Sequence, residues 1–173
     1  MFIGVAVVVG ALLGIGILAL TSPAMAPEKT FTVVAYHWGF AIYDEQGNEI
    51  PRIEVAQGTV VTLLVIGAEA LSHEIHEAYV ERVIETWADN PDYGGMSAEE
   101  IEAAIEGAGA SGLLNHSLSI DGYDVEVPTD VSSPVPQQFT FIAHKSGTFA
   151  IRCLTYCGSG HGYMVIEDGF VVN

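Results

Sequence analysis

The chain has 173 residues and carries 22 acidic side chains against 5 Lys and Arg, so its formal net charge is −17. This charge excludes binding to a nucleic-acid backbone, because each phosphate contact would work against the field of the whole protein. Half of the residues are apolar, which excludes an acidic disordered tail, and the two cysteines are too few for a disulfide framework.

The first 27 residues carry no Asp, Glu, Lys or Arg, and residues 2–20 form one uncharged, mostly apolar run. At about 1.5 Å per residue, a helix of this length spans about 28 Å, close to the thickness of a hydrocarbon core. Residues 24–26 resemble a signal-peptide cleavage site, so a removed signal peptide is the alternative. The lack of a basic residue before the run, and Pro27 after it, favour a retained transmembrane helix over residues 1–27.

Short runs of β-branched and aromatic residues, separated by turn residues, begin at residue 31. This pattern is typical of an antiparallel β-sandwich or barrel, so the fold class predicted for residues 28–173 is all-β. We expect strands at residues 31–36, 52–55, 59–66, 118–120, 123–127, 137–142, 148–152 and 169–172.

The β pattern stops over residues 67–112. Apolar residues recur every four positions over residues 75–87, which predicts an amphipathic helix. A second helix is expected to begin at Ser97, where Glu100 completes a capping box, and to end near Gly107. The segment holds 11 acidic residues and one arginine, so we expect an acidic helical hairpin inserted into the β domain.

A Gly-rich loop near the C-terminus contains four candidate metal ligands, Cys153, Cys157, His161 and Met164. Thiolate and thioether are soft ligands and imidazole is borderline, so the set favours copper over Mg²⁺ or Ca²⁺. A structural zinc site would not use Met164, and a mononuclear blue site needs one cysteine. A second thiolate four residues away is able to bridge two copper ions. The alternative, two buried cysteines and a core methionine, does not explain four such residues at regular intervals.

A pair of bridged copper ions needs one more nitrogen ligand besides His161. His116, which opens the strand expected at residues 118–120, is the candidate, and His73 and His76 on the acidic helix are its competitors. We expect the remaining histidines at the surface or at a strand end, namely His37, His73, His76 and His144.

The spacing Cys-x-x-x-Cys-x-x-x-His-x-x-Met, with an upstream His opening a strand, resembles the binuclear CuA domain of cytochrome c oxidase subunit II in its short, single-anchor form. The resemblance implies a cupredoxin-like Greek-key sandwich that holds two copper ions. Many family members carry a glutamate at the position of Thr155, and the side chain of that glutamate joins a magnesium site. This chain departs from the family there. Carried over to this chain, the ligands are His116, Cys153, the backbone carbonyl of Thr155, Cys157, His161 and Met164.

The resemblance also implies a function and a location. The chain would be the electron-transfer subunit of a heme-copper terminal oxidase, anchored in the cell membrane with its copper domain on the extracytoplasmic side. It would accept electrons from a small soluble donor, either cytochrome c or a small blue copper protein, and pass them to heme in subunit I. Tyr36 and Trp38 look like the aromatic region where electrons enter in the family, and ordinary core packing is the alternative.

Two other functions remain open. A copper chaperone for oxidase assembly also uses Cys-x-x-x-Cys and a distant His, but in a thioredoxin-like βαβ setting rather than an all-β pattern. A membrane-anchored CuA carrier for a nitric oxide or nitrous oxide reductase would carry the same motif.

The excess of acidic over basic residues has two interpretations. Glu77, Glu81 and Glu85 lie four residues apart, and such like charges destabilise a helix in dilute buffer. Ions in a salt-rich, halophilic host would screen this repulsion, whereas a basic electron donor would be attracted by it. The 11 acidic residues outside the insertion favour the first interpretation.

Overall fold

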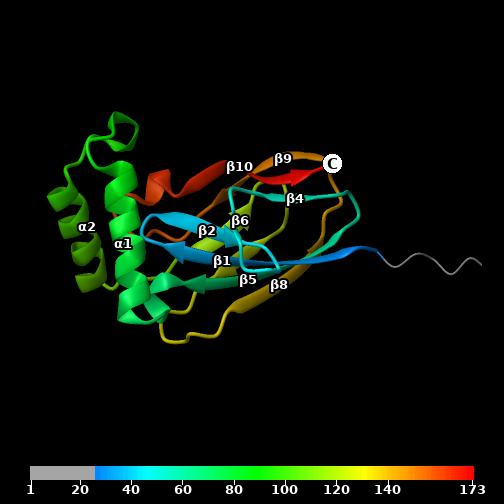
Figure 1. The fold of residues 1–173 in the computed structure, drawn as a ribbon, viewed down its shortest axis with the longest axis horizontal. Helices are drawn as coiled ribbons and strands as arrows, with labels where there is room; N and C mark the ends of the chain where they lie inside the picture. Colours follow the sequence, from blue (N-terminus) through cyan, green and yellow to red (C-terminus); the bar gives the residue numbers. More distant parts are fainter. Residues whose placement is uncertain (1–25) are drawn as a thin grey trace, which may run out of the picture.

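The computed structural model describes residues 26–173, which form a β-sandwich with a helical hairpin at one end (Figure 1). The transmembrane helix expected over residues 1–27 lies almost entirely outside the described residues. Within the described part, no helix is both long and apolar enough to cross a membrane. The all-β sandwich and its inserted helices, both expected from the sequence, are confirmed.

The first sheet has five strands in the order β3-β2-β1-β5-β8. β1 and β5 pair in parallel, so the expectation of a purely antiparallel sandwich is wrong here. The reason is that the chain crosses to the second sheet after β3 and forms β4 there. When it returns to the first sheet as β5, it runs in the same direction as β1. The strands are β1 Glu28–Tyr36, β2 Gly39–Tyr43, β3 Glu49–Ile50, β5 Val60–Gly67 and β8 Gln137–Ile142.

The second sheet has five strands in the order β4-β10-β9-β6-β7, and β4 pairs in parallel with β10. β9 and β10 form the antiparallel pair that holds the two ends of the Gly-rich loop. The strands are β4 Ile53–Val55, β6 Ser117–Ile120, β7 Glu126–Pro128, β9 Gly147–Arg152 and β10 Val165–Val172.

Every strand predicted from the sequence is present, but some bounds differ and two strands were missed. β2 and β3 extend the first sheet beyond β1, where the short segments gave no clear alternation. β10 begins before the expected residue 169, because a shift of register between Ile166 and Phe170 accommodates the polar residues that interrupt its apolar pattern. The strand expected at 123–127 is reduced to β7.

The inserted helices lie close to their predicted positions. The segment consists of η1 Ala68–Ala70, α1 His73–Trp87, η2 Pro91–Tyr93 and α2 Ala98–Ala110. The capping box of Ser97 and Glu100 is confirmed. α2 continues past the expected end, because the left-handed residue that stops it is Gly112, with φ +73°. The amide of Leu113 then closes on the carbonyl of Ala108 at 2.9 Å.

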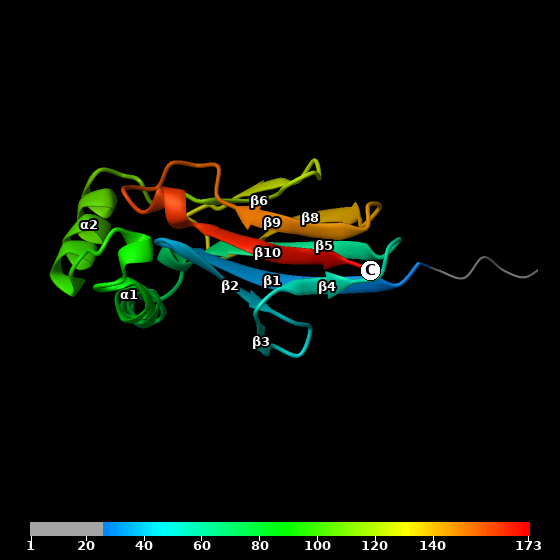
Figure 2. The same cartoon turned by 90° about the horizontal axis from the view of Figure 1, so that it is seen from above.

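The core lies between the two sheets and continues under the helical hairpin. Val33, Leu63 and Ile151 are fully buried between the sheets, while Val83 and Ile101 bury the inner faces of α1 and α2. The hairpin caps the same end of the sandwich as the loop between β9 and β10, and the described chain starts at the opposite end (Figures 1 and 2). The insertion is therefore placed to cover the candidate ligands.

The exposed acidic face of α1 gives a prediction about salt. Glu77, Glu81 and Glu85 are all exposed. We expect the melting temperature of the purified chain to rise from dilute buffer to molar KCl, because the Debye length falls from about 10 Å at 0.1 M to about 3 Å at 1 M. Differential scanning calorimetry over this range measures it, and a melting temperature that stays constant would contradict the halophilic interpretation.

Candidate metal centre

The Gly-rich loop connects β9 to β10 and is closed at its base by the two strands. Cys153 follows β9 directly, and its amide donates a 3.2 Å hydrogen bond to the carbonyl of Met164, which precedes β10. Between them, η3 (His161–Tyr163) turns the chain back. Gly158 has φ +107°, a conformation that side-chain-bearing residues rarely adopt. This loop brings together four candidate ligands that lie close in the sequence.

The sulfur atoms of the loop face one another in a buried space. Cys157 Sγ lies 3.7 Å from His161 Nδ1 and 3.9 Å from Met164 Sδ. Cys153 Sγ lies 3.1 Å from the carbonyl oxygen of Thr155. Both cysteines are free and, like Met164, buried. The two cysteine sulfurs lie within 4.8 Å of each other, so all five groups that the resemblance implies in this loop converge.

The upstream histidine reaches the same space from the second sheet. His116 directly precedes β6, and one of its ring nitrogens lies within 4.8 Å of both cysteine sulfurs. Thr129 clamps its backbone, since the Thr129 hydroxyl accepts from the His116 amide at 2.9 Å and donates to its carbonyl at 3.2 Å. Of the three upstream candidates, the structure places His116, and neither His73 nor His76, beside the cysteines.

Ser117 fixes the loop against β6. Its hydroxyl accepts hydrogen bonds from the amides of Leu154 and Thr155, at 3.0 and 3.2 Å, and its own amide donates to Cys153 Sγ at 3.5 Å. These contacts hold the Thr155 carbonyl toward the sulfur of Cys153. Ser117 belongs to the His-Ser-Leu sequence that resembles the family's pattern at its first ligand, but that pattern did not predict these contacts.

Glu69 orients His116, and sequence reasoning missed it. His116 Nε2 donates to Glu69 Oε1 at 3.0 Å, which leaves Nδ1 as the free nitrogen. Nδ1 is buried and finds no hydrogen-bond partner among the described residues. A buried nitrogen without a partner, beside two thiols, fits a metal ligand. The only signal in the sequence was a single carboxylate in the apolar stretch that follows β5.

His37 supports Glu69 from the other side. We expected His37 at the surface, but this is wrong, because it is only 2% exposed. The insertion covers the end of β1, so Nδ1 of His37 meets Glu69 Oε1 at 2.8 Å and Nε2 meets the carbonyl of Leu113 at 3.0 Å. His37, Glu69 and His116 also form a group of potential ligands. A metal there would have to break these hydrogen bonds.

The pKa values follow from this network. Burial would lower the pKa of His116, but the neighbouring Cys153 and Glu69 outweigh it by favouring the charged imidazolium and raise the pKa to about 9. Burial would raise the pKa of Glu69, but hydrogen bonds from His116 and His37 outweigh it and lower the pKa to about 2. A hydrogen bond from Cys157, aided by His116, lowers the pKa of Cys153, so this thiol ionises first.

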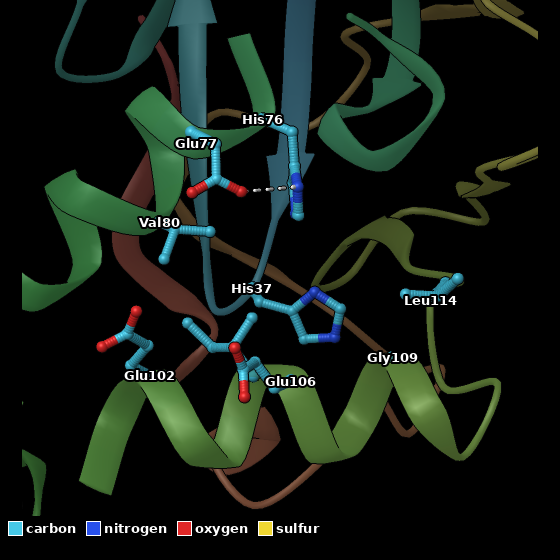
Figure 3. A pocket seen from close by; sticks show the side chains of 9 residues that line it. His37, His76, Glu77, Val80, Glu102, Glu106, Gly109 and Leu114 are labelled. Carbon is cyan, nitrogen blue, oxygen red and sulfur yellow. Dashed lines mark ion pairs between the residues drawn. The ribbon is translucent and has the colours of Figure 1, made fainter. Parts of the chain in front are cut away.

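The other histidines lie elsewhere. His73 is on the surface, with its side chain 87% exposed, and His144 follows β8 and is exposed. His76 is partly buried and lines a cavity of about 150 Å³ between α1 and α2, in which its side chain points toward the ring of His37 (Figure 3). Its Nδ1 lies 3.9 Å from Oε1 of Glu77. Among the described residues, neither His73 nor His76 joins a group of three potential metal ligands.

Tyr36 and Trp38, the aromatic residues suggested as the place where electrons enter, are both buried. Trp38 is 1% exposed, and its Nε1 donates a 2.8 Å hydrogen bond to the carbonyl of Cys157. Tyr36 is 7% exposed and stacks on Tyr79, with ring centroids 4.7 Å apart. Only Trp38 contacts a candidate ligand.

The donor set fits copper. Two thiols, two imidazole nitrogens, a thioether and a carbonyl surround one buried space, and soft sulfur donors with imidazole are the ligands that copper prefers. The hydrogen bond from His116 to Glu69 is the kind of contact that fixes the tautomer of a ligating histidine.

This contact gives a prediction. Replacing Glu69 by Gln is expected to lower the copper affinity of the chain by about 10–100-fold, because the neutral amide holds His116 less firmly. Competition with a copper chelator measures the affinity. Glu77→Gln, a change of the same kind on the exposed face of α1, serves as the control and is expected to leave the affinity unchanged. Equal affinities of the two variants would contradict the orienting role of Glu69.

Comparisons with known proteins give structural neighbours only. No protein-family model and no curated protein matches the chain. The periplasmic domain of subunit II of cytochrome oxidase from Bradyrhizobium japonicum has 14% identity and a TM-score of 0.48, with 84% of this chain and 83% of that chain covered. A heme-copper terminal oxidase dimer has 15% identity and a TM-score of 0.48, with 86% and 66% covered.

A blue copper protein, auracyanin A from Chloroflexus aurantiacus, has 13% identity and a TM-score of 0.38, with 84% of this chain and 99% of that chain covered. Because the identities and TM-scores are low, the function of the chain has to be derived from its own side chains.

Proposed function

We propose that the chain is the electron-transfer subunit, subunit II, of a heme-copper terminal oxidase and holds a binuclear CuA centre. The observation that carries the proposal is the convergence of two cysteine sulfurs with His116 Nδ1, His161 Nδ1, Met164 Sδ and the Thr155 carbonyl. A copper pair bridged by two thiolates accepts and releases one electron with little rearrangement. The chain alone would not reduce oxygen.

The residues of the chain position the metals and exclude water. Cys153 and Cys157 would bridge the pair, while His116 and His161 would supply one nitrogen to each metal. Cys157, Met164 and His116 are at most 1% exposed, so the centre is dry on the side of the core. No general base or nucleophile is required for this role.

The ligand loop also offers a surface toward a partner. Leu154 and Tyr156 flank Thr155 and are 56% and 61% exposed, and Tyr156 lies edge-on to His161 with ring centroids 5.7 Å apart. Exposed apolar side chains of this size are typical of a protein contact. We place subunit I, with its heme, against Leu154 and Tyr156, and a soluble electron donor against a different surface of the domain.

The proposal includes a location. Residues 1–27 would anchor the chain in the cell membrane and residues 28–173 would lie on the extracytoplasmic side. Fractionation of cells into membrane and soluble parts, with protease accessibility of the copper domain in intact cells, tests it. Recovery of the chain in the soluble fraction would contradict the anchor.

The test of the function is copper stoichiometry together with electron paramagnetic resonance on the purified chain. Two copper ions per chain and a mixed-valence, purple centre are expected, because the second cysteine is able to bridge a second metal. One copper per chain, or a blue mononuclear spectrum, would contradict the proposal.

Two alternatives use the same cysteines. The position of both cysteines between two strands of a sandwich speaks against a thioredoxin-like copper chaperone. A CuA carrier for a nitric oxide or nitrous oxide reductase differs only in its partner. Purification of the intact complex, followed by identification of its heme subunit, separates it from an oxidase.

A further inference from the structure

Trp38 lies between the candidate metal centre and the helical insertion, and it does not reach the surface. Its Nε1 is bonded to the carbonyl of Cys157, and a side chain at Gly160 would collide with its ring. Only 1% of its surface is exposed. A partner protein therefore cannot touch this residue directly.

Residues of the insertion continue the aromatic contacts outward from Trp38. Trp87, the last residue of α1, stacks on Trp38 with ring centroids 5.5 Å apart and an angle of 28°. Tyr93 of η2 stacks on Trp87 at 4.5 Å and 7°. These separations are within the usual range for aromatic pairs. We call Trp38, Trp87 and Tyr93 the aromatic relay.

The outer end of the aromatic relay, the half-buried Tyr93, contacts a tyrosine that lies at the surface. Tyr163 of η3 meets Trp87 edge-on at 5.5 Å and Tyr93 at 5.7 Å, and it is 40% exposed. A cavity of about 150 Å³ is lined in part by Trp38, Trp87, Tyr93 and Tyr163. The relay thus joins the Cys157 carbonyl to the surface formed by η2 and η3 through unbroken ring contacts.

Tyr36 leads in another direction. It stacks on Tyr79 of α1, and the Tyr79 hydroxyl is hydrogen-bonded to that of Tyr43 at 2.9 Å. Within the described part of the chain, Tyr36 has no ring contact or side-chain hydrogen bond with a candidate ligand. This pair of tyrosines provides a comparison for the relay.

The surface at η2 is acidic. Asp89 precedes η2 and Asp92 belongs to it. Both are exposed, and they are close in the sequence to Trp87 and Tyr93. Arg82 lines the same cavity as Trp87 and Tyr93, but it is paired with Glu49, and the sequence contains no other Lys or Arg over residues 82–144. Such a one-sided charge favours the approach of a cationic protein.

We propose that the insertion moves the electron-accepting surface of the domain outward, to η2 and η3, where a cationic one-electron redox protein docks. One electron leaves the reduced group of that protein, passes through the aromatic relay and reduces the copper pair by one electron. The donor is oxidised by one electron, and no proton or bond is exchanged. This inference rests on the proposed function and adds the route and the surface to it.

The first experiment measures electron transfer to the copper-loaded full chain from a reduced basic c-type cytochrome by stopped flow. Trp87→Leu is expected to lower the rate constant at saturating cytochrome severalfold while its Kd is unchanged. Trp87→Phe, which keeps a ring in contact, is expected to retain most of the rate. Tyr79→Leu on the same helix is the matched control. Equal rates for Trp87→Leu and Tyr79→Leu would overturn the route.

The second experiment tests the charge of the surface. Replacing Asp89 and Asp92 together by Asn is expected to lower the second-order rate constant at low salt by about tenfold, because electrostatic steering is weakened. Replacing Asp124 and Glu126 together by uncharged amides, the same charge change beside β7, is the control. An equal effect of both double variants would overturn docking at η2.

The third experiment needs neither a variant nor copper. Hydrogen–deuterium exchange of the copper-free full chain is compared with and without the oxidised cytochrome. Protection at η2 and η3 supports the docking surface, and protection confined to other elements overturns it. Failure of the wild-type chain to bind two copper ions would instead refute the proposed function. The exchange result would still report on the docking surface, because it is measured on the copper-free chain.

Discussion

Replacing Cys157 by serine is expected to remove the copper pair. Cys157 Sγ lies within reach of every side-chain donor of the loop, 3.7 Å from His161 Nδ1 and 3.9 Å from Met164 Sδ. A hydroxyl does not supply the soft, negatively charged bridge that holds two copper ions. We expect the copper content to fall from two ions to at most one per chain, with loss of the mixed-valence resonance.

The controls for this change separate the roles of the other ligands. Met164→Leu is expected to keep two copper ions but to shift the reduction potential, because an axial thioether is a weak ligand that mainly tunes the metal. His73→Ala is expected to leave the spectrum intact and His116→Ala to abolish it. Loss of the signal on replacing His73, with retention on replacing His116, would contradict the ligand assignment. Melting of the copper-free variants shows whether each one folds.

Replacing Gly160 by alanine is expected to destabilise the copper-free chain strongly. Its φ is −84°, so the backbone itself accepts a side chain. The Cβ, however, would lie 2.0 Å from Cδ2 and 2.1 Å from Cε3 of Trp38. That ring is held by Trp87 and by its hydrogen bond to Cys157, so it cannot move aside.

Overpacking of this kind costs about 1–3 kcal/mol and in rigid sites more, so we expect a loss of about 3 kcal/mol in the free energy of unfolding. Urea denaturation measures it. Gly162→Ala, two residues along the same loop, is the matched control, since nothing lies within 4 Å of its added Cβ. Its effect is expected to stay within about 0.5 kcal/mol. Similar losses for both variants would contradict the packing explanation.

The candidate ligands were largely accessible from the sequence because they are local. Cys153, Cys157, His161 and Met164 lie in one loop, and the chemistry of their side chains does not depend on the surrounding fold. His116 was chosen by its place before a strand, and the structure brings it to the cysteines. Their role as copper ligands stays a prediction until metal is measured.

The sequence also predicted the two helices and most strands, since periodicity and capping are short-range signals. It did not predict the parallel pairings of β1 with β5 and of β4 with β10, because alternation along a strand carries no information about its partner. β2 was missed because its five residues show no alternation of buried and exposed positions. Its pairing with β1 is decided by the turn that joins them, not by its own residues.

What only the tertiary structure decided are the contacts that the insertion makes with the β domain. Glu69 meets His116 and His37 across 47 and 32 residues of sequence, and no local pattern connects them. The burial of His37 and of Trp38 follows from the same contacts, because the helices close over the end of β1. The sequence by itself determined which groups are able to bind metal, since side-chain chemistry is local. The fold determined which of them meet, how they are oriented and which surface leads to them, because these depend on packing between distant segments.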